Sequence, residues 1–143
     1  MRKILFRGLD KRGGWHYGFV CQDTNGGWRI KERIAKTHFA AYDVIAETIG
    51  QYTGMEDKSN IRIFAGDIVE APDFWNSGED GIGVIIFTFG AFAVKCRDES
   101  TPMSEWGYED EIKTHLEIIG NIHQSRIQNI TRNHNKQTRK TSQ

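Results

Sequence analysis

The first candidate for catalysis in this sequence is a short match to the pattern of metal-dependent nucleases. Pro72-Asp73 and Glu111-Ile112-Lys113 supply two carboxylates and a lysine, which could hold a divalent metal and stabilise charge at an attacked phosphate. However, Asp73 falls in a Trp-Asn-Ser-Gly loop instead of a strand, and Glu111 ends an acidic stretch. Because so short a pattern arises readily by chance, a metal-dependent nuclease is only our third hypothesis.

The other reactive side chains are scattered along the chain. The histidines show neither H-x-x-x-H nor H-E-x-x-H spacing, no serine lies in a nucleophile elbow, and no glycine-rich phosphate loop precedes a helix. The histidines are His16, His38, His115, His123 and His134. We therefore predict no catalytic residues, no metal site and no cofactor, and we favour a protein that is not an enzyme.

Three further residues have structural interpretations. Cys21 and Cys96 are 75 positions apart, with no C-x-x-C motif, and each falls in an expected strand. We predict two small buried hydrophobic residues in a reducing compartment, in preference to a disulfide or a nucleophile. Asp67 follows a turn glycine and precedes Ile68-Val69, so we expect it to cap backbone amides in that turn.

The formal net charge of zero conceals a segregation of charge. Residues 1–124 hold fourteen lysines and arginines against nineteen acids, whereas residues 125–143 hold five basic residues and no acid. The basic residues of this tail are Arg126, Arg132, Lys136, Arg139 and Lys140. The tail could contact phosphates, fold back on the acidic domain of its own or a neighbouring chain, or simply aid solubility. With only Ile127 and Ile130 to pack, we expect it to be disordered or a short helix.

Aromatic residues in two charged loops are candidates for binding. Trp106 and Tyr108 lie in the acidic segment 97–111, and Trp75 lies in the loop 73–81. Such residues can contact a basic protein partner, and together they would form one patch if both loops lay at the same end of the domain. A solvated loop is the alternative.

The sequence from residue 3 to residue 122 predicts a series of short strands. Fifteen glycines, two prolines and 38% hydrophobic residues suit a β-rich core with tight turns. We expect strands at residues 3–8, 15–21, 28–34, 47–54, 61–64, 67–70, 82–89, 91–96 and 116–122. Asn25-Gly26 predicts a hairpin turn with two positive φ angles. We expect residues 35–45 to form a helical turn or irregular crossing, 97–111 to form a loop, and the apolar run 82–89 to be buried on both faces.

Membrane signals are missing from the sequence. The apolar run at the N-terminus is too short for a signal peptide, and no segment approaches the roughly 20 apolar residues that span a bilayer. We expect a cytoplasmic protein that does not associate with membranes.

Four blocks in order along residues 3–122 resemble the YopX-like family of phage and prophage proteins. They are Lys3 to Asp10, Glu47 to Gly54, Asp57 to Val69 and Leu116 to Ile122. This chain has Ser59-Asn60 where the family typically has Asn-Gly, and Ala65 where the family has an acid. The resemblance implies a β-rich fold containing a small SH3-like barrel and a phage or prophage origin. It implies no established activity and no catalytic residues.

These observations predict two segments and a ranked set of functions. Residues 1–124 would form a mainly β domain, an SH3-like barrel with additional hairpins and little helix, followed by the basic tail 125–143. Our leading hypothesis is an accessory protein that acts by binding a protein partner or by self-association. A nucleic-acid-binding module that uses the tail is the second.

Overall fold

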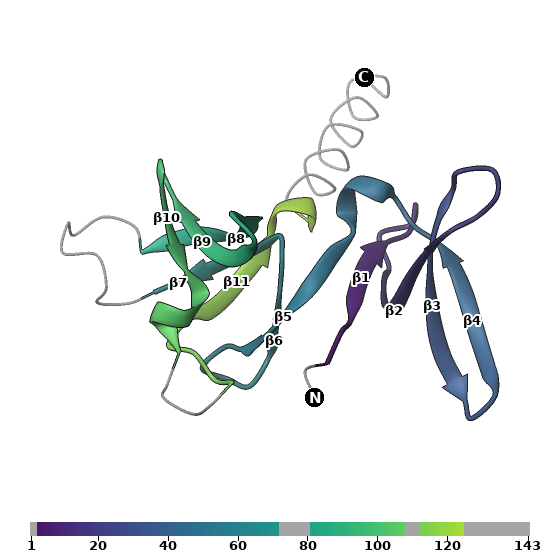
Figure 1. Cartoon of the computed structure of the whole chain (residues 1–143), viewed down its shortest axis with the longest axis horizontal. Coiled ribbons are helices and arrows are strands. Elements are labelled where there is room, and N and C mark those ends of the chain that lie inside the picture. The colour runs from purple at the N-terminus through teal and green to yellow at the C-terminus, as the bar shows by residue number, and fades with distance from the viewer. Residues whose placement is uncertain (1–2, 72–80, 108–111, 125–143) are drawn as a thin grey trace, which may run out of the picture.

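In this computed structural model, residues 3–71, 81–107 and 112–124 are described, and they fold into two antiparallel β-sheets (Figure 1). The first has the strand order β4-β3-β2-β1-β5-β6 and the second β10-β9-β8-β7-β11. The first sheet comprises β1 (Phe6–Leu9), β2 (Trp15–Gln22), β3 (Trp28–Ala35), β4 (His38–Asp43), β5 (Gly50–Glu56) and β6 (Arg62–Phe64). The second comprises β7 (Asp67–Glu70), β8 (Ile82–Thr88), β9 (Ala91–Cys96), β10 (Glu99–Pro102) and β11 (Glu117–Asn121). Two 3₁₀ turns, η1 (Ala46–Thr48) and η2 (Met103–Trp106), complete the elements that carry labels.

The larger core belongs to the second sheet. Its buried members come from β6 to β9, from η2 and from the segment before β11, and they are Ile63, Val69, Ala71, Ile85, Val94, Met103, Trp106 and Leu116. Strand β8 is buried on one face only, since Ile85 is buried whereas Ile82, on the opposite face of the strand, is exposed. The expectation that the run 82–89 is buried on both faces is therefore wrong, because this sheet packs its core on one side.

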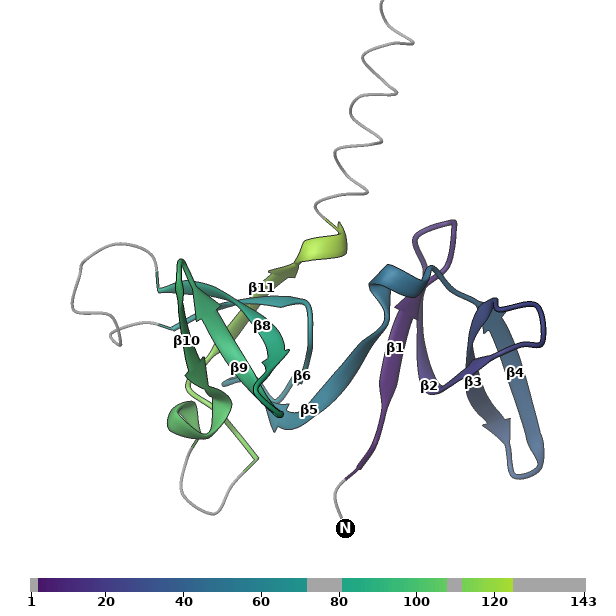
Figure 2. The ribbon, with the colours of Figure 1, turned by 45° about the horizontal axis from the view of Figure 1, so that its top comes forward.

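The first sheet extends away from this core. In both views β3 and β4 lie at the end of the molecule far from the second sheet, while β1 and β5 lie between (Figures 1 and 2). Its fully buried residues include Leu9 and Ile30, and His16 stacks on Tyr42 with ring centroids 3.9 Å apart. The outer part of the sheet thus has a small core on one face.

The hairpin of β5 and β6 joins the sheets. The buried carboxylate of Asp57 accepts hydrogen bonds from the backbone N–H groups of Ser59 and Ile61 in the connecting turn, and from Ile118 in β11. Asn60 in this turn has φ 65°, a conformation that favours glycine or asparagine. An asparagine is therefore accommodated at this position of the turn.

Three expectations about local structure are wrong. Residues 38–43 form edge strand β4, paired with β3, instead of a helical turn or an irregular crossing. The hairpin predicted at Asn25-Gly26 does join β2 to β3, but φ is positive only at Gly26, because Asp23 Oδ1 accepts the N–H groups of Asn25 and Gly27 and holds a longer loop. The segment 97–111 includes β10 and η2 and so is not simply a loop; Arg97, with φ 56°, makes the turn that pairs β10 with β9.

The mainly β class predicted from the sequence is confirmed. Within the described residues the strands form two open sheets and not a closed barrel, so the SH3-like description stays a prediction. Among those residues, no helix is both long and apolar enough to cross a membrane.

Candidate functional site

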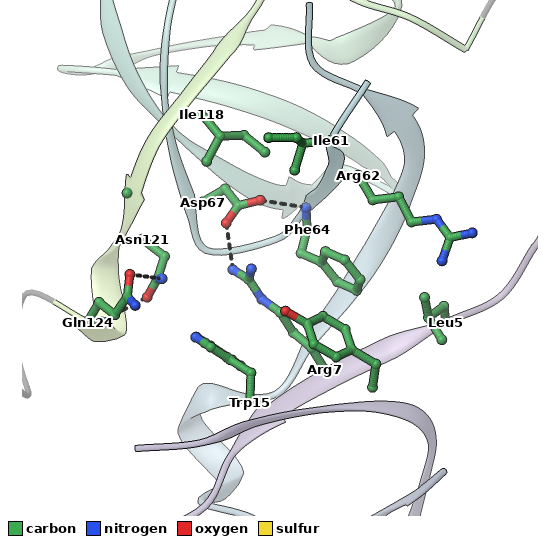
Figure 3. Close-up of a pocket in the computed structure, with 12 residues that line it drawn as sticks. Leu5, Arg7, Trp15, Ile61, Arg62, Phe64, Asp67, Ile118, Asn121 and Gln124 are labelled. Carbon is green, nitrogen blue, oxygen red and sulfur yellow. Dashed lines mark hydrogen bonds and ion pairs between the residues drawn. The ribbon is translucent and has the colours of Figure 1, made fainter. Parts of the chain in front are cut away.

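A pocket of about 540 Å³ opens between the two sheets (Figure 3). Strands β1, β2 and β6 and the turn before β6 form one side, and β7, β11 and the residues after β11 form the other. The lining residues are Leu5, Arg7, Trp15, Tyr17, Ile61, Arg62, Phe64, Asp67, Ile118, Gly120, Asn121 and Gln124. The walls are largely aliphatic and aromatic, with a few polar groups among them, which is the usual make-up of a ligand site.

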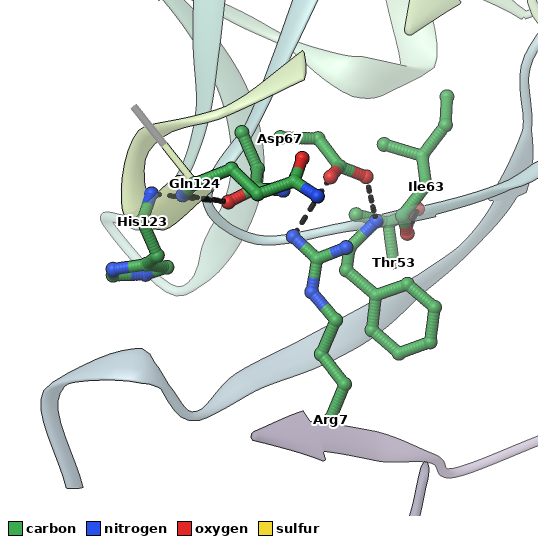
Figure 4. Close-up of polar contacts among 8 residues, drawn as sticks. Arg7, Thr53, Ile63, Asp67, His123 and Gln124 are labelled. Carbon is green, nitrogen blue, oxygen red and sulfur yellow. Dashed lines mark hydrogen bonds and ion pairs between the residues drawn. The ribbon is translucent and has the colours of Figure 1, made fainter. Parts of the chain in front are cut away.

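A buried ion pair crosses the base of this pocket. Arg7 Nη2 donates to Asp67 Oδ1 at 2.7 Å, and both side chains are more than nine-tenths buried. The other carboxylate oxygen, Oδ2, accepts the backbone N–H of Phe64 at 2.8 Å. Asp67 thus caps the turn between β6 and β7, as the sequence predicts, and also ties β1 to the second sheet (Figure 4).

The guanidinium of Arg7 lies against two aromatic rings. Its central carbon is 4.4 Å from the ring centroid of Trp15 and 4.9 Å from that of Phe64. Arg7 Nε is buried and has no hydrogen-bond partner among the described residues. A buried donor left in this way costs about 1–3 kcal/mol, so an acceptor atom from a bound molecule would be favourable here.

Burial raises the pKa of Asp67 above its ordinary value of 3.8. The positive charge of Arg7 and the N–H of Phe64 oppose this shift without cancelling it. The carboxylate therefore depends on Arg7 for its charged state more than an exposed aspartate would.

The chain just after β11 forms the rim of the pocket. Asn121 Oδ1 accepts the backbone N–H groups of His123 and Gln124, and Asn121 Nδ2 donates to Gln124 Oε1 (Figures 3 and 4). His123 also contacts Trp15 edge to face, with ring centroids 6.2 Å apart. Gly120, which lines the pocket, has no atom within 4 Å of the position a Cβ would take, so the wall is open at this point.

The structure overturns one predicted binding residue and leaves others outside its described part. Trp106 is 2% exposed and belongs to the core of the second sheet, so it is not a surface contact residue. Met103 and Trp106 are three residues apart on η2, which directs both side chains inward. Trp75, Tyr108 and the five basic residues Arg126, Arg132, Lys136, Arg139 and Lys140 lie outside the described residues, as does the predicted tail.

The remaining candidates are dispersed. Cys21 and Cys96 are not joined by a disulfide, and both are partly buried. Among the described residues no group of three or more His, Cys, Asp or Glu side chains could hold a metal ion. Asp73 and Glu111 of the nuclease pattern fall outside those residues.

Arg7 is the principal functional residue that the sequence does not predict, and its partner Asp67 lies 60 positions away.

A second signal that the sequence analysis missed is the unequal distribution of basic and acidic residues between the two halves of the domain. Residues 1–64 hold eleven basic residues against seven acids, whereas residues 65–124 hold three against twelve. The first sheet and the N-terminal side of the pocket therefore come from the basic part of the domain.

Comparison with known proteins identifies a family. The model of the family described as YopX protein matches residues 14–126. The crystal structure of protein EF1440 from Enterococcus faecalis is similar, with a TM-score of 0.51 and 20% identity over 86% of this chain and 95% of that one, a likeness that concerns the fold alone. A search of curated proteins finds no match. With the family pattern spanning most of both sheets, the chain belongs to the YopX family.

Proposed function

We propose that this protein acts by binding, and that the pocket between the two sheets receives an apolar or aromatic side chain of a protein partner. The observation that carries this proposal is the pocket itself, with Trp15, Phe64 and Ile118 among its walls. Ile61 and Tyr17, which also line it, are 56% and 40% exposed, and pockets of this make-up commonly receive apolar side chains.

The polar groups of the pocket support a peptide-like occupant. The buried Nε of Arg7 is a donor that a backbone carbonyl of an inserted segment would satisfy. At the rim, the amide oxygens of Asn121 and Gln124 are already engaged, and their amide nitrogens are donors that can pair with a backbone carbonyl. A segment that contributes one apolar side chain and its flanking carbonyl would match both parts of the site.

The phage or prophage setting and the host cytoplasm are part of this proposal and rest on the family resemblance. A second copy of the chain is the alternative occupant. Such self-association would give a dimer in solution, which sedimentation can detect.

The test blocks the pocket without touching the ion pair. Gly120→Phe introduces a side chain at a pocket wall where a Cβ meets nothing within 4 Å and φ is not positive. Ile119→Phe is the matched control, because the neighbouring Ile119 is 48% exposed and does not line the pocket. With the tagged full-length chain in a host extract, the expected partner is retained by the wild type and Ile119→Phe, and lost by Gly120→Phe.

The indole N–H signals in NMR spectra report directly on binding of the partner at the pocket. The signal assigned to Trp15 by a Trp15→Phe variant should shift when the partner binds. A partner retained equally by Gly120→Phe and wild type would refute the proposal. Loss of a wild-type dimer in Gly120→Phe would instead identify a second copy as the occupant.

A further inference from the structure

One face of the β2, β3 and β4 strands carries exposed aromatic and basic side chains side by side. Phe19 pairs with Lys31 across β2 and β3, and Arg33 pairs with Phe39 across β3 and β4. Directly opposed residues of antiparallel strands point to the same side, and Lys31 and Arg33 are two apart on one strand, so all four share this face. We call these four residues the aromatic–basic face.

The two phenylalanine rings of this face are accessible to a partner. Phe19 is 58% exposed and Phe39 is 45% exposed, and their ring centroids are 6.5 Å apart. The Arg33 guanidinium lies 5.3 Å from the centroid of the Phe39 ring. On the opposite side of the same strands, Ile30 is fully buried, so the small core of this part of the sheet is on that side. Phe19 and Phe39 are therefore exposed although these strands have a core, because they lie on the side of the sheet opposite to it.

The cations of the face are available to a negatively charged partner. Neither Lys31 nor Arg33 forms an ion pair with a described residue. Arg29, further along the same side of β3, is engaged instead by Asp43 at 2.9 Å. The surrounding segment, residues 1–64, has an excess of four basic residues, whereas residues 65–124 have an excess of nine acids. The positive charge is thus concentrated in the part of the domain that exposes the two rings.

We propose that the aromatic–basic face binds single-stranded nucleic acid. Unpaired bases would stack on Phe19 and Phe39, while Lys31 and Arg33 would contact the flanking phosphates. Surfaces that bind single strands combine these two elements, because every base has a face that stacks on an aromatic ring and every phosphate is negative. A duplex fits less well, since its bases are already stacked on one another.

Two observations favour this occupant over other partners. The exposed rings at the β8–β9 hairpin, Phe87 and Phe89, lie in the acid-rich part of the chain, so exposed aromatics and cations coincide specifically on the first sheet. Tyr17 is two residues before Phe19 on β2 and is 40% exposed, which continues the row of rings toward the pocket. This site is separate from the pocket and does not depend on the function proposed for it.

The first test measures the contribution of the rings in the full-length chain. A fluorescein-labelled oligothymidine of about 12 nucleotides is titrated by anisotropy at about 50 mM NaCl. The double variant Phe19→Ala/Phe39→Ala should raise Kd about tenfold or more, because it removes two stacking positions. Phe87→Ala is the matched control, since Phe87 is 61% exposed on the other sheet, and it should leave Kd within about twofold.

The second test measures the contribution of the cations. The double variant Lys31→Gln/Arg33→Gln should lower the slope of log K against log salt concentration by about 1.4, because each phosphate contact on a single strand contributes about 0.7. The control Lys95→Gln, at an exposed position on β9, should leave the slope unchanged. The basic tail is the same in all these chains, so differences between them report on the face.

Four outcomes would overturn the proposal. They are absence of binding at low salt, equal competition by a duplex of the same length, an unchanged Kd in the phenylalanine double variant, and a wild-type dimer that this variant abolishes. The last would make the face an interface between copies of the chain. If the double variant failed to fold, photocrosslinking of the wild type to a thiouridine-containing strand would decide, with crosslinks expected in peptides that contain Phe19 and Phe39. Crosslinks confined to other peptides would refute the site.

Discussion

Replacing Arg7 by methionine removes the cation that neutralises Asp67 while keeping an unbranched side chain against Trp15 and Phe64. The side chains of the pair are only 8% and 3% exposed, so water cannot replace the lost partner. Removing one member of a buried pair typically costs about 3–5 kcal/mol. Because Asp67 keeps its hydrogen bond from the Phe64 N–H, we expect the lower end, a loss of about 3 kcal/mol in the free energy of unfolding near neutral pH.

The loss should depend on pH in a defined direction. Burial already raises the pKa of Asp67, and removing Arg7 takes away the main opposing influence, so the pKa in the variant rises further. A carboxyl whose folded pKa exceeds its unfolded value contributes stability that is fully present below the unfolded value and is lost as the pH rises through the folded value. The deficit of Arg7→Met should therefore be smallest near about pH 4 and grow toward neutral pH.

Urea denaturation followed by tryptophan fluorescence over this pH range measures the deficit. Lys58→Met is the matched control, because Lys58 Nζ and Glu117 Oε2 form a pair at 3.1 Å whose side chains are 44% and 43% exposed. Such exposed pairs contribute little, so we expect a change of at most about 0.5 kcal/mol. If Arg7→Met were no less stable than Lys58→Met near neutral pH, or if its loss of stability did not vary with pH, our account of the junction between the two sheets, the Arg7–Asp67 ion pair, would be refuted.

Three other changes test separate parts of the fold. Gly18→Ala sets a Cβ against a backbone carbonyl of β3 and should lower the free energy of unfolding by about 1–3 kcal/mol. Gly120→Ala places its Cβ in open space and should be neutral or stabilising. Equal melting temperatures for the two variants would contradict this. The hydrogen bond to His16 is the largest of the influences that lower the pKa of Asp10 to about 2, and the backbone N–H groups of Gly14 and Arg12 lower it further. NMR titration of His16→Ala should therefore show this pKa rising part of the way toward 3.8, and the pair's contribution to wild-type stability should be lost as the pH falls from about 4 to about 2. Trp106→Ala should cost about 3–5 kcal/mol in urea denaturation, and a loss below about 1 kcal/mol would show that the residue is not core.

Local signals account for what the sequence could predict. The alternation from Trp15 to Cys21 and the apolar run joined by Gly90 identify β2 and the β8–β9 hairpin, since strand periodicity and glycine turns depend on neighbouring residues only. The sequence predicts Asp67 as a turn cap for the same reason, because this carboxylate accepts an N–H only three residues away. Its second role, with Arg7, depends on chain packing across 60 positions, which no local pattern encodes.

The errors have physical causes of the same kind. The edge strand β4 is partly or fully exposed throughout, so it lacks the apolar alternation by which a strand is recognised. Trp106 looked like a surface residue because acids surround it in sequence. Its spacing of three from Met103 is the period of a 3₁₀ turn, and that pairing of two large apolar residues was the overlooked sign of a buried face.

The two proposed binding sites differ in what holds them in place, and this makes them separable. The pocket has walls from both sheets, so its shape depends on the junction that Arg7 and Asp67 stabilise. The aromatic–basic face comes from β2, β3 and β4 alone, whose register is set by their own pairing. Loosening the junction should therefore disturb the pocket while leaving the face intact, as long as the first sheet remains folded. The distribution of charge along the chain separates the two sites in the same way. The aromatic–basic face is formed only by residues of the basic segment 1–64, whereas the pocket is lined by residues of that segment and of the acidic segment 65–124.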